Sequence, residues 1–216
     1  MLSTLLLLTS FIPSAQAAPM GQIAMPGSYH GDEMPVVADD AWLGLYETAQ
    51  GYEWRPVAPS FQSAVDPVLD MPGQQTGVEV AVSGETPMLL VRGVAALKPG
   101  PASRAKVARV RMVPGATEDL PGGLWLRAAT DDSGAYRLLL EGDDGLSQVL
   151  CAHETLYDDT VPTLMLAGDL DGDGKMDLLI DTSNHYNLSR VTLYLSSAAG
   201  TGERVAPVAA LQTTGC

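Results

Sequence analysis

The sequence is short of positive charge. Its 216 residues include 12 Lys and Arg against 26 Asp and Glu, which gives a formal net charge of −14. Nucleic acids and anionic membranes attract basic surfaces, so this balance argues against both as partners and favours solubility. We therefore expect no nucleic-acid partner.

Several enzyme motifs are also missing. The sequence contains no Gly-rich phosphate-binding loop, no G-x-S-x-G nucleophile elbow and no H-E-x-x-H helix. Beyond the N-terminal segment, no stretch approaches the roughly 20 apolar residues that a membrane helix needs. The sequence therefore predicts neither a membrane span nor any of these catalytic sites.

The N-terminal segment is typical of a secretory signal. Leu5–Leu8 and Phe11–Ile12 form a short apolar run, and Ala15-Gln16-Ala17 follows as an A-x-A cleavage pattern. No Lys or Arg precedes the run, so only the amino terminus supplies positive charge there. We expect a signal peptide over residues 1–17, cleaved after Ala17, and a secreted or periplasmic protein.

Cysteine is nearly absent, with Cys151 and Cys216 the two examples. In an oxidising compartment such a pair usually forms a disulfide, and this one would anchor the last residue of the chain. The alternative is two free thiols. Predicted export and the even cysteine count together favour a Cys151–Cys216 bridge.

Short apolar runs separated by turn residues predict a mainly β protein, and proline recurs too often for long helices. Aromatic residues at 42, 46, 52 and 54 favour a hairpin with one packed face. Asp-Gly turns separate further runs in the second half of the chain. The predicted strands cover residues 42–46, 52–57, 77–83, 88–91, 124–129, 135–141, 146–151, 163–167, 178–180, 191–195 and 205–211.

This spacing is typical of an antiparallel β-sandwich or a propeller-like sheet. Residues 18–40 are rich in Pro and Gly, and we expect them to form an extended or disordered lead-in. Pro-Gly pairs near residues 114–122 indicate a boundary. We therefore predict two packed β units, over residues 41–115 and 120–216.

Residues 169–177, Asp-Leu-Asp-Gly-Asp-Gly-Lys-Met-Asp, carry the clearest chemical signal. Carboxylates stand at alternate positions, and the intervening glycines let the backbone curl so that oxygens can converge. A hard divalent cation takes roughly six to eight oxygen ligands, which this pattern can supply. The alternative is an acidic, solvent-facing turn without an ion.

The loop opens like an EF-hand but does not end like one. Counted from Asp169, the position of the bidentate Glu holds Ile180. The aliphatic run Leu178–Ile180 indicates a buried strand and not the start of a helix. We therefore expect a calcium loop inside a β-hairpin.

Residues 166–180 resemble the cation loop of the FG-GAP repeat of integrin-α propellers and of the related bacterial VCBS-type repeats. The resemblance implies that the ion, Ca²⁺, is held by the side chains of Asp169, Asp171, Asp173 and Asp177 and by the backbone carbonyl of Lys175. The Phe-Gly and Gly-Ala-Pro parts of the repeat are missing, and one copy cannot close a propeller. The resemblance thus implies a metal site and does not extend to the fold of the chain.

Three histidines offer other candidate sites. His30 with Asp32 and Glu33 could bind a metal, but we expect a solvated tail there. His153 could activate Cys151 as a nucleophile, which the predicted disulfide would prevent. His185 lies in the polar run 181–187, which either binds a glycan or a protein or is an ordinary polar turn.

Two further sequence features do not have a single interpretation. The basic residues within 104–111 either dock an acidic ligand or form the outer face of a strand. Asn187-Leu188-Ser189 matches the N-glycosylation pattern, which matters only in a eukaryotic source.

These observations predict an exported, non-enzymatic calcium-binding protein with a structural, adhesion or recognition role and an extracellular protein or glycan as partner. The alternative is a hydrolase of extracellular polymers with a structural calcium site. Such an enzyme needs a paired acid and base, for which Glu154, Asp158 and Asp159 are the candidate acidic residues. A third possibility is an exported inhibitor or accessory subunit.

Overall fold

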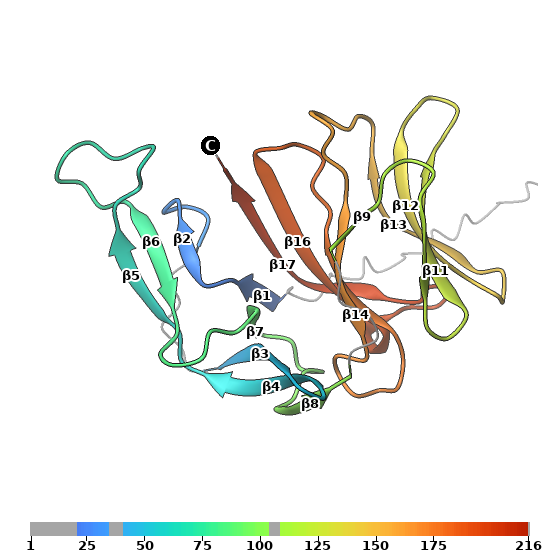
Figure 1. Cartoon of the computed structure of the whole chain (residues 1–216), viewed down its shortest axis with the longest axis horizontal. Coiled ribbons are helices and arrows are strands. Elements are labelled where there is room, and N and C mark those ends of the chain that lie inside the picture. The colour runs from blue at the N-terminus through green and yellow to red at the C-terminus, as the bar shows by residue number, and fades with distance from the viewer. Residues whose placement is uncertain (1–20, 35–40, 104–108, 216) are drawn as a thin grey trace, which may run out of the picture.

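A computed structural model describes residues 21–34, 41–103 and 109–215 of the chain. Within these ranges the regular structure is almost entirely β, and the single helical element is a 3-10 turn, η1 (Ser196–Ala198). The predicted mainly β fold of packed sheets is confirmed (Figure 1). The predicted signal peptide and its cleavage point lie outside the described residues.

The largest sheet is curled and has ten strands (Figure 1). Neighbouring strands in it are antiparallel, except for one parallel pair in which Gly21 lies opposite Ala209. In spatial order its strands are β8 (Gly100–Ala102), β4 (Gly51–Val57), β3 (Trp42–Thr48), β7 (Leu89–Arg92), β1 (Gly21–Ala24), β17 (Ala206–Thr214), β16 (Leu188–Leu195), β15 (Asp177–Asp181), β14 (Thr163–Gly168) and β9 (Val110–Arg111).

Two smaller antiparallel sheets complete the described structure. A four-stranded meander consists of β10 (Thr117–Leu120), β11 (Leu124–Thr130), β12 (Tyr136–Gly142) and β13 (Ser147–His153). A three-stranded sheet has the order β2 (Gly27–Tyr29), β6 (Gly77–Ala81) and β5 (Ser60–Ala64). The strands predicted from the apolar runs all correspond to strands of the structure.

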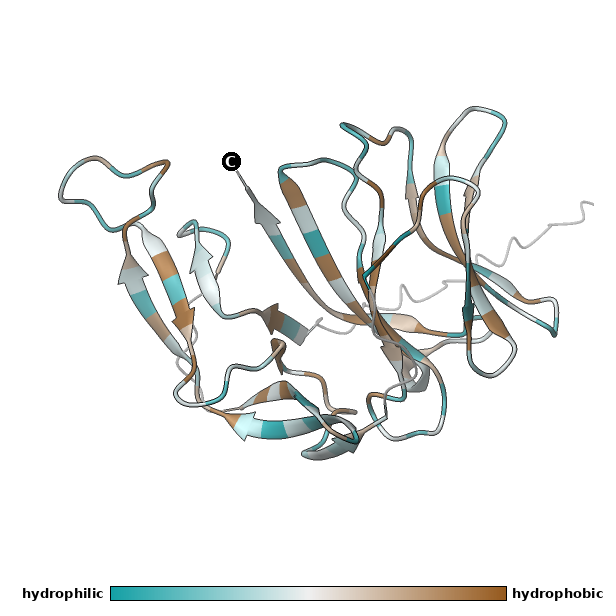
Figure 2. Cartoon of the chain, viewed as in Figure 1, coloured by the Kyte–Doolittle hydropathy of each residue, from teal (hydrophilic) through white to brown (hydrophobic). Residues whose placement is uncertain are grey.

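The meander packs against strands β14, β15 and β16 of the large sheet. Alternate residues of β12 are buried, as a strand covered on one face requires. Figure 2 shows the resulting hydrophobic and hydrophilic bands along the strands of this sheet. The cluster between the two sheets takes aliphatic side chains from both, among them Leu126, Leu138, Leu140, Leu164, Leu178 and Ile180.

A second core fills the curl of the large sheet. It contains Trp42 and Trp54 from the N-terminal hairpin together with Leu179 from β15. Since Leu178 and Ile180 belong to the first core, β15 is buried on both faces. This explains why its sequence is a continuous aliphatic run and does not alternate.

Two points of the organisation differ from what the sequence suggested. Of the lead-in predicted to be extended or disordered, residues 21–34 include two extended strands, and β1 lies inside the large sheet between β7 and β17. The division predicted near residues 114–122 does not separate two sheets, since the ten-stranded sheet takes strands from both sides of it. A strand of four residues is too short to show a periodicity, so the contribution of β1 was not visible in the sequence.

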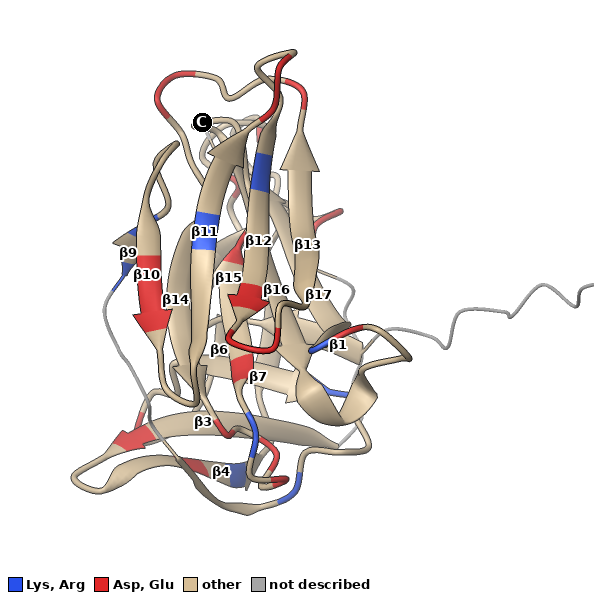
Figure 3. Ribbon diagram, turned by 90° about the vertical axis from the view of Figure 1, so that its right-hand side faces the viewer, with Lys and Arg blue, Asp and Glu red and all other residues tan. Residues whose placement is uncertain are grey.

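Charges of both signs lie on the strands of the meander (Figure 3). Arg127 donates from Nε to Oε2 and from Nη2 to Oε1 of Glu141, each at 2.7 Å. Trp125 Nε1 and Ser147 Oγ also donate to this carboxylate, each at 2.9 Å. The Arg127 guanidinium, helped by these two donors, lowers the pKa of Glu141 to about 2.

We predict that Glu141→Gln weakens the acid dependence of folding. A lowered pKa in the folded state stabilises the protein above the usual Glu pKa, and this stabilisation is lost as the pH falls toward 2. The variant should therefore be about 1–2 kcal/mol less stable than the wild type at pH 7 and nearly equal to it at pH 2. Urea unfolding over this pH range measures the difference. The control is Glu154→Gln, at an exposed position. The prediction would be contradicted if the free energy of unfolding of Glu141→Gln differed from that of the wild type by the same amount at every pH.

Candidate metal centre

The acidic loop connects β14 to β15, as the sequence predicts. Gly168 pairs with Asp177 at the base of this antiparallel hairpin. The Asp169 carboxylate accepts hydrogen bonds from the amides of Gly172 at 2.7 Å and Gly174 at 3.0 Å. Both glycines have φ of +83°, a left-handed conformation that other residues rarely adopt. The glycine spacing thus wraps the backbone around the first carboxylate.

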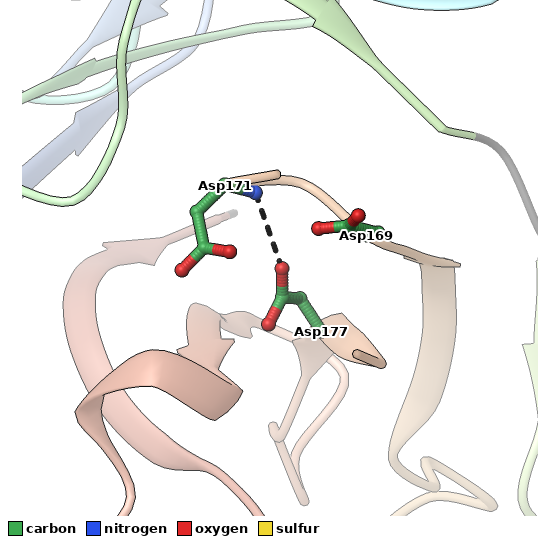
Figure 4. A group of neighbouring side chains, drawn as sticks. All are labelled: Asp169, Asp171 and Asp177. Atoms are coloured by element: carbon green, nitrogen blue, oxygen red, sulfur yellow. Dashed lines mark hydrogen bonds between the residues drawn. The ribbon is translucent and has the colours of Figure 1, made fainter. Parts of the chain in front are cut away.

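Three of the predicted ligands converge. One carboxylate oxygen from each of Asp169, Asp171 and Asp177 lies within 4.8 Å of the other two (Figure 4). Oxygens that bind one Ca²⁺ at about 2.4 Å are separated by no more than about 4.8 Å, so this arrangement fits a single hard cation. Asp169 and Asp171 are half-buried, and Asp177 is fully buried.

Asp177 is the most constrained of the three. Its Oδ2 accepts from the amides of Leu170 at 2.7 Å and Asp171 at 3.3 Å (Figure 4 marks the second bond). Its Oδ1 accepts from the amide of Ser196 at 2.7 Å and from Ser196 Oγ at 3.0 Å. Burial, with a smaller contribution from the Asp171 carboxylate, raises the pKa of Asp177 to about 6 against these bonds. A cation beside it would favour the ionised form.

Asp173 and Lys175 lie at the edge of the group. Ser196 Oγ contacts both oxygens of Asp173 at 3.0 Å, so this carboxylate lies near Asp177 although it is outside the convergent trio. The Lys175 amide donates to Asp173 Oδ1 at 2.8 Å, and the Lys175 side chain is exposed. These two residues could supply further oxygens around an ion.

Sequence reasoning missed the serines of η1. Ser196 contacts Asp173 and Asp177, and Ser197 Oγ hydrogen-bonds Asp171. They stand 19 to 26 residues from these partners in the chain. The one available signal was their place directly after the predicted strand 191–195, a strand that pairs with the aliphatic exit of the loop.

The N-terminal half of the chain also contacts the loop. Trp54 Nε1 donates to the Leu170 carbonyl at 2.7 Å. The Asp169 amide donates to Ser103 Oγ at 3.2 Å, and the Ser103 amide donates to the Asp169 carbonyl at 2.9 Å. The loop is thus fixed by three separate segments: the β4 strand, residue 103 and η1.

The predicted disulfide involves a residue outside the described part of the chain, Cys216. Cys151 on β13 is half-buried, and burial raises the pKa of its thiol to about 12. Burial lowers the pKa of His153, whose ring lies 6.3 Å from that of Tyr136. A protonated thiol at neutral pH makes Cys151 a poor nucleophile. The Cys151–Cys216 bridge stays a prediction.

His30 is not in a solvated tail. Its Nδ1 lies 2.5 Å from Oδ2 of the buried Asp66, and its amide donates to Glu33 at 3.2 Å. Glu33 is itself bonded to Thr214 at the end of β17. The described hydrogen-bond partners of His30 are thus Glu33 and Asp66, and Asp66 is a residue that the sequence analysis did not consider.

Other predicted residues border a groove of about 760 Å³. Asp158 and Asp159 line it, and so do Asp181, His185 and other residues of the polar run. Glu154 is not part of its lining. Of the predicted basic segment, Arg111 reaches the groove, and Nη2 of its guanidinium donates to the Asp159 carbonyl at 2.5 Å.

The chain matches no protein-family model, no curated protein and no solved structure. Within the described residues, no helix has the length and apolar character needed to cross a membrane.

We predict that Ser196→Ala destabilises the protein, because it removes the hydroxyl shared by Asp173 and Asp177 in a buried setting. The loss should be about 1–2 kcal/mol in the free energy of unfolding, measured with urea at pH 7 in the presence of a chelator. Ser197→Ala is the matched control, since Ser197 is exposed, and it should change stability by less than about 0.5 kcal/mol. Equal midpoints for both variants and the wild type would show that Ser196 does not support the loop.

Proposed function

We propose that this is an exported, non-enzymatic calcium-binding protein. In this proposal Asp169, Asp171 and Asp177 hold the ion, and Asp173 and the Lys175 carbonyl complete the oxygen ligands. The observation that carries the proposal is the convergence of three carboxylate oxygens within 4.8 Å, one of them on a fully buried residue.

The burial of Asp177 argues for a cation and against an ordinary acidic turn. A turn that only faces solvent would let its carboxylates spread apart in water, where repulsion between them is weak. Here one carboxylate is 0% exposed and two others are held beside it. A divalent ion would offset both the desolvation and the repulsion.

The nature of the ligands favours calcium. The group contains carboxylates and neither His nor Cys, and oxygen-only sets suit hard cations. A flexible glycine loop accommodates the irregular coordination of Ca²⁺ better than the strict octahedron of Mg²⁺. The resemblance of residues 166–180 to FG-GAP and VCBS-type loops points the same way.

The proposed role of the ion is structural. The loop contacts β4, residue 103 and η1, so an ion inside it would hold together segments from both halves of the chain. Rigid loops can then present recognition residues to an extracellular protein or glycan. The signal-like N-terminus and the acidic composition support export to a compartment where calcium reaches millimolar levels, and such a compartment would also permit the predicted Cys151–Cys216 disulfide.

We predict that calcium raises the melting temperature. Extracellular calcium modules bind with dissociation constants of about 10⁻⁴–10⁻³ M. Calcium at ten times this constant should add about 1.4 kcal/mol, or about 3–6 °C for a chain of this size, compared with chelator. Magnesium at the same concentration should do less.

The site variant for this test is Asp171→Asn, and the control is Asp132→Asn on the exposed β11–β12 turn. Asp171→Asn should lose the calcium-dependent rise and the Ca²⁺ retained in equilibrium dialysis, while Asp132→Asn keeps both. An unchanged melting temperature in calcium and chelator, with no ion retained by the wild type, would refute the proposal.

One observation favours the hydrolase as a second candidate. The groove brings Asp158 and Asp159 together with His30, whose pKa is raised by its hydrogen bond to Asp66. An oriented imidazole near carboxylates can serve in general acid–base chemistry. A panel of glycosidase and esterase substrates tests this candidate: turnover by the wild type that His30→Gln abolishes would support it, and no turnover on the panel would count against it.

A further inference from the structure

The groove of about 760 Å³ is separate from the acidic loop and has two unlike walls. One wall comes from the β2 turn and the loop between β5 and β6, and the other from the loops that precede β14 and β16. Figure 1 shows these elements on either side of β17, whose C-terminal end borders the groove at residues 213–215. Its volume is in the range of ligand sites in proteins.

The wall formed by the loops that precede β14 and β16 is aromatic. The His185 ring lies between Tyr157, at 5.5 Å, and Tyr186, at 4.9 Å between ring centroids. The Tyr157 amide donates to the Asn184 carbonyl at 2.9 Å, and Asn184 Nδ2 donates to the Thr155 carbonyl at 2.9 Å, so the two loops are fastened together. Tyr186 is nevertheless 68% exposed and Tyr157 50% exposed. His185 and Tyr186 line the groove and are open to a ligand, and Tyr157 packs beside His185.

The groove is strongly acidic. Five carboxylates line it, and among the described residues that do so Arg111 is the one Lys or Arg side chain. Three of the five are committed to internal hydrogen bonds: Glu33, Asp66 and Asp181. Asp158 and Asp159 are exposed, and the Asp158 carboxylate lies 3.6 Å from His185 Nε2. Exposed carboxylates beside aromatic faces form a site for a cation, through ion pairing and cation–π contact.

The opposite wall is aliphatic. Val65 and Val68 line the groove at 58% and 53% exposure, and Leu69 and Met71 continue the apolar surface beside them. The loop that carries them is ordered by Asp66, whose Oδ1 accepts from the amides of Val68 and Leu69 at 3.0 and 3.1 Å. When a hydrogen-bonded loop keeps several apolar side chains exposed to solvent, the exposed surface indicates a contact with a partner.

We propose that the groove binds an extended polypeptide segment in which Lys or Arg side chains alternate with apolar ones. The basic side chains contact Asp158, Asp159 and the face of Tyr186, and the apolar side chains cover Val65 and Val68. We choose a cationic partner because its charge is complementary to the carboxylates of the groove. The net charge of −14 adds a general attraction for such a partner. A neutral oligosaccharide would use the aromatic wall but would leave the carboxylate excess and the aliphatic wall without a counterpart.

The test uses dye-labelled hexapeptides and the full mature protein in calcium buffer. Fluorescence anisotropy compares Lys-Leu-Lys-Leu-Lys-Leu with Lys-Ser-Lys-Ser-Lys-Ser and Glu-Leu-Glu-Leu-Glu-Leu. We expect the first to bind at least about tenfold more tightly than the other two, with an affinity that falls as salt is raised. Equal binding of all three would overturn the proposal.

The matched variants separate a site from general attraction between an acidic protein and a basic peptide. Asp158 and Asp159 have φ of 53° and 56°, which Asn tolerates, so the double variant Asp158→Asn/Asp159→Asn keeps the backbone. It should weaken binding about tenfold, and Tyr186→Ala should weaken it about threefold. The double variant Asp132→Asn/Asp143→Asn removes the same charge from the exposed turns of the meander and should change affinity less than about twofold.

Three outcomes would count against the groove. Equal losses in the two double variants would show nonspecific attraction, and no loss in either would place the peptide elsewhere. Binding of cellohexaose that Tyr186→Ala abolishes, without binding of the basic peptide, would identify a glycan site instead. Calcium-independent peptide binding with an intact groove would support this inference even if the loop proved to hold no ion.

Discussion

The burial of one carboxylate, that of Asp177, constrains the acidic loop and the adjacent turn η1. It is the first residue of β15, it is 0% exposed, and it accepts hydrogen bonds from the preceding loop and from η1. A carboxylate without water costs several kcal/mol unless partners surround it. The loop backbone, the Ser196 amide and the Ser196 hydroxyl therefore have to stay together, and their arrangement defines where a cation could bind.

This constraint depends in turn on the position of β15 between the two cores. Leu178 and Ile180 face the meander while Leu179 faces the tryptophan-containing core, so a register shift in β15 would disturb both. Trp54 adds a direct bond from the second core to the Leu170 carbonyl. The acidic loop is therefore held by strands from both halves of the chain, and the two halves cannot be treated as independent units.

Much of the fold was accessible from the sequence because turns and strands leave local signals. Asp-Gly turns and apolar runs marked the meander, and the aliphatic run after Asp177 identified a hairpin in place of an EF-hand. The features that could not be predicted depend on contacts between residues that are far apart in the sequence. The four residues of β1 join the large sheet only through partners near residues 91 and 209, and Ser196 reaches Asp177 only because β16 lies next to β15. The groove has the same origin, since residues 28–33, 65–68, 158–163 and 181–189 meet there without any shared pattern.

The two acidic features of the protein differ in exposure, and this difference decides which counter-charge each can accept. In the loop the carboxylates lie within 4.8 Å of one another around a buried member, so only a small ion can approach all of them, and the protein around it supplies a low dielectric that strengthens the attraction. In the groove Asp158 and Asp159 are open to water, where each charge is screened within about 8–10 Å. There a cation gains little unless it also removes apolar and aromatic surface from water. Tyr186, Val65 and Val68 provide such surface, which is why we propose a small ion for the loop and a larger, partly apolar cation for the groove.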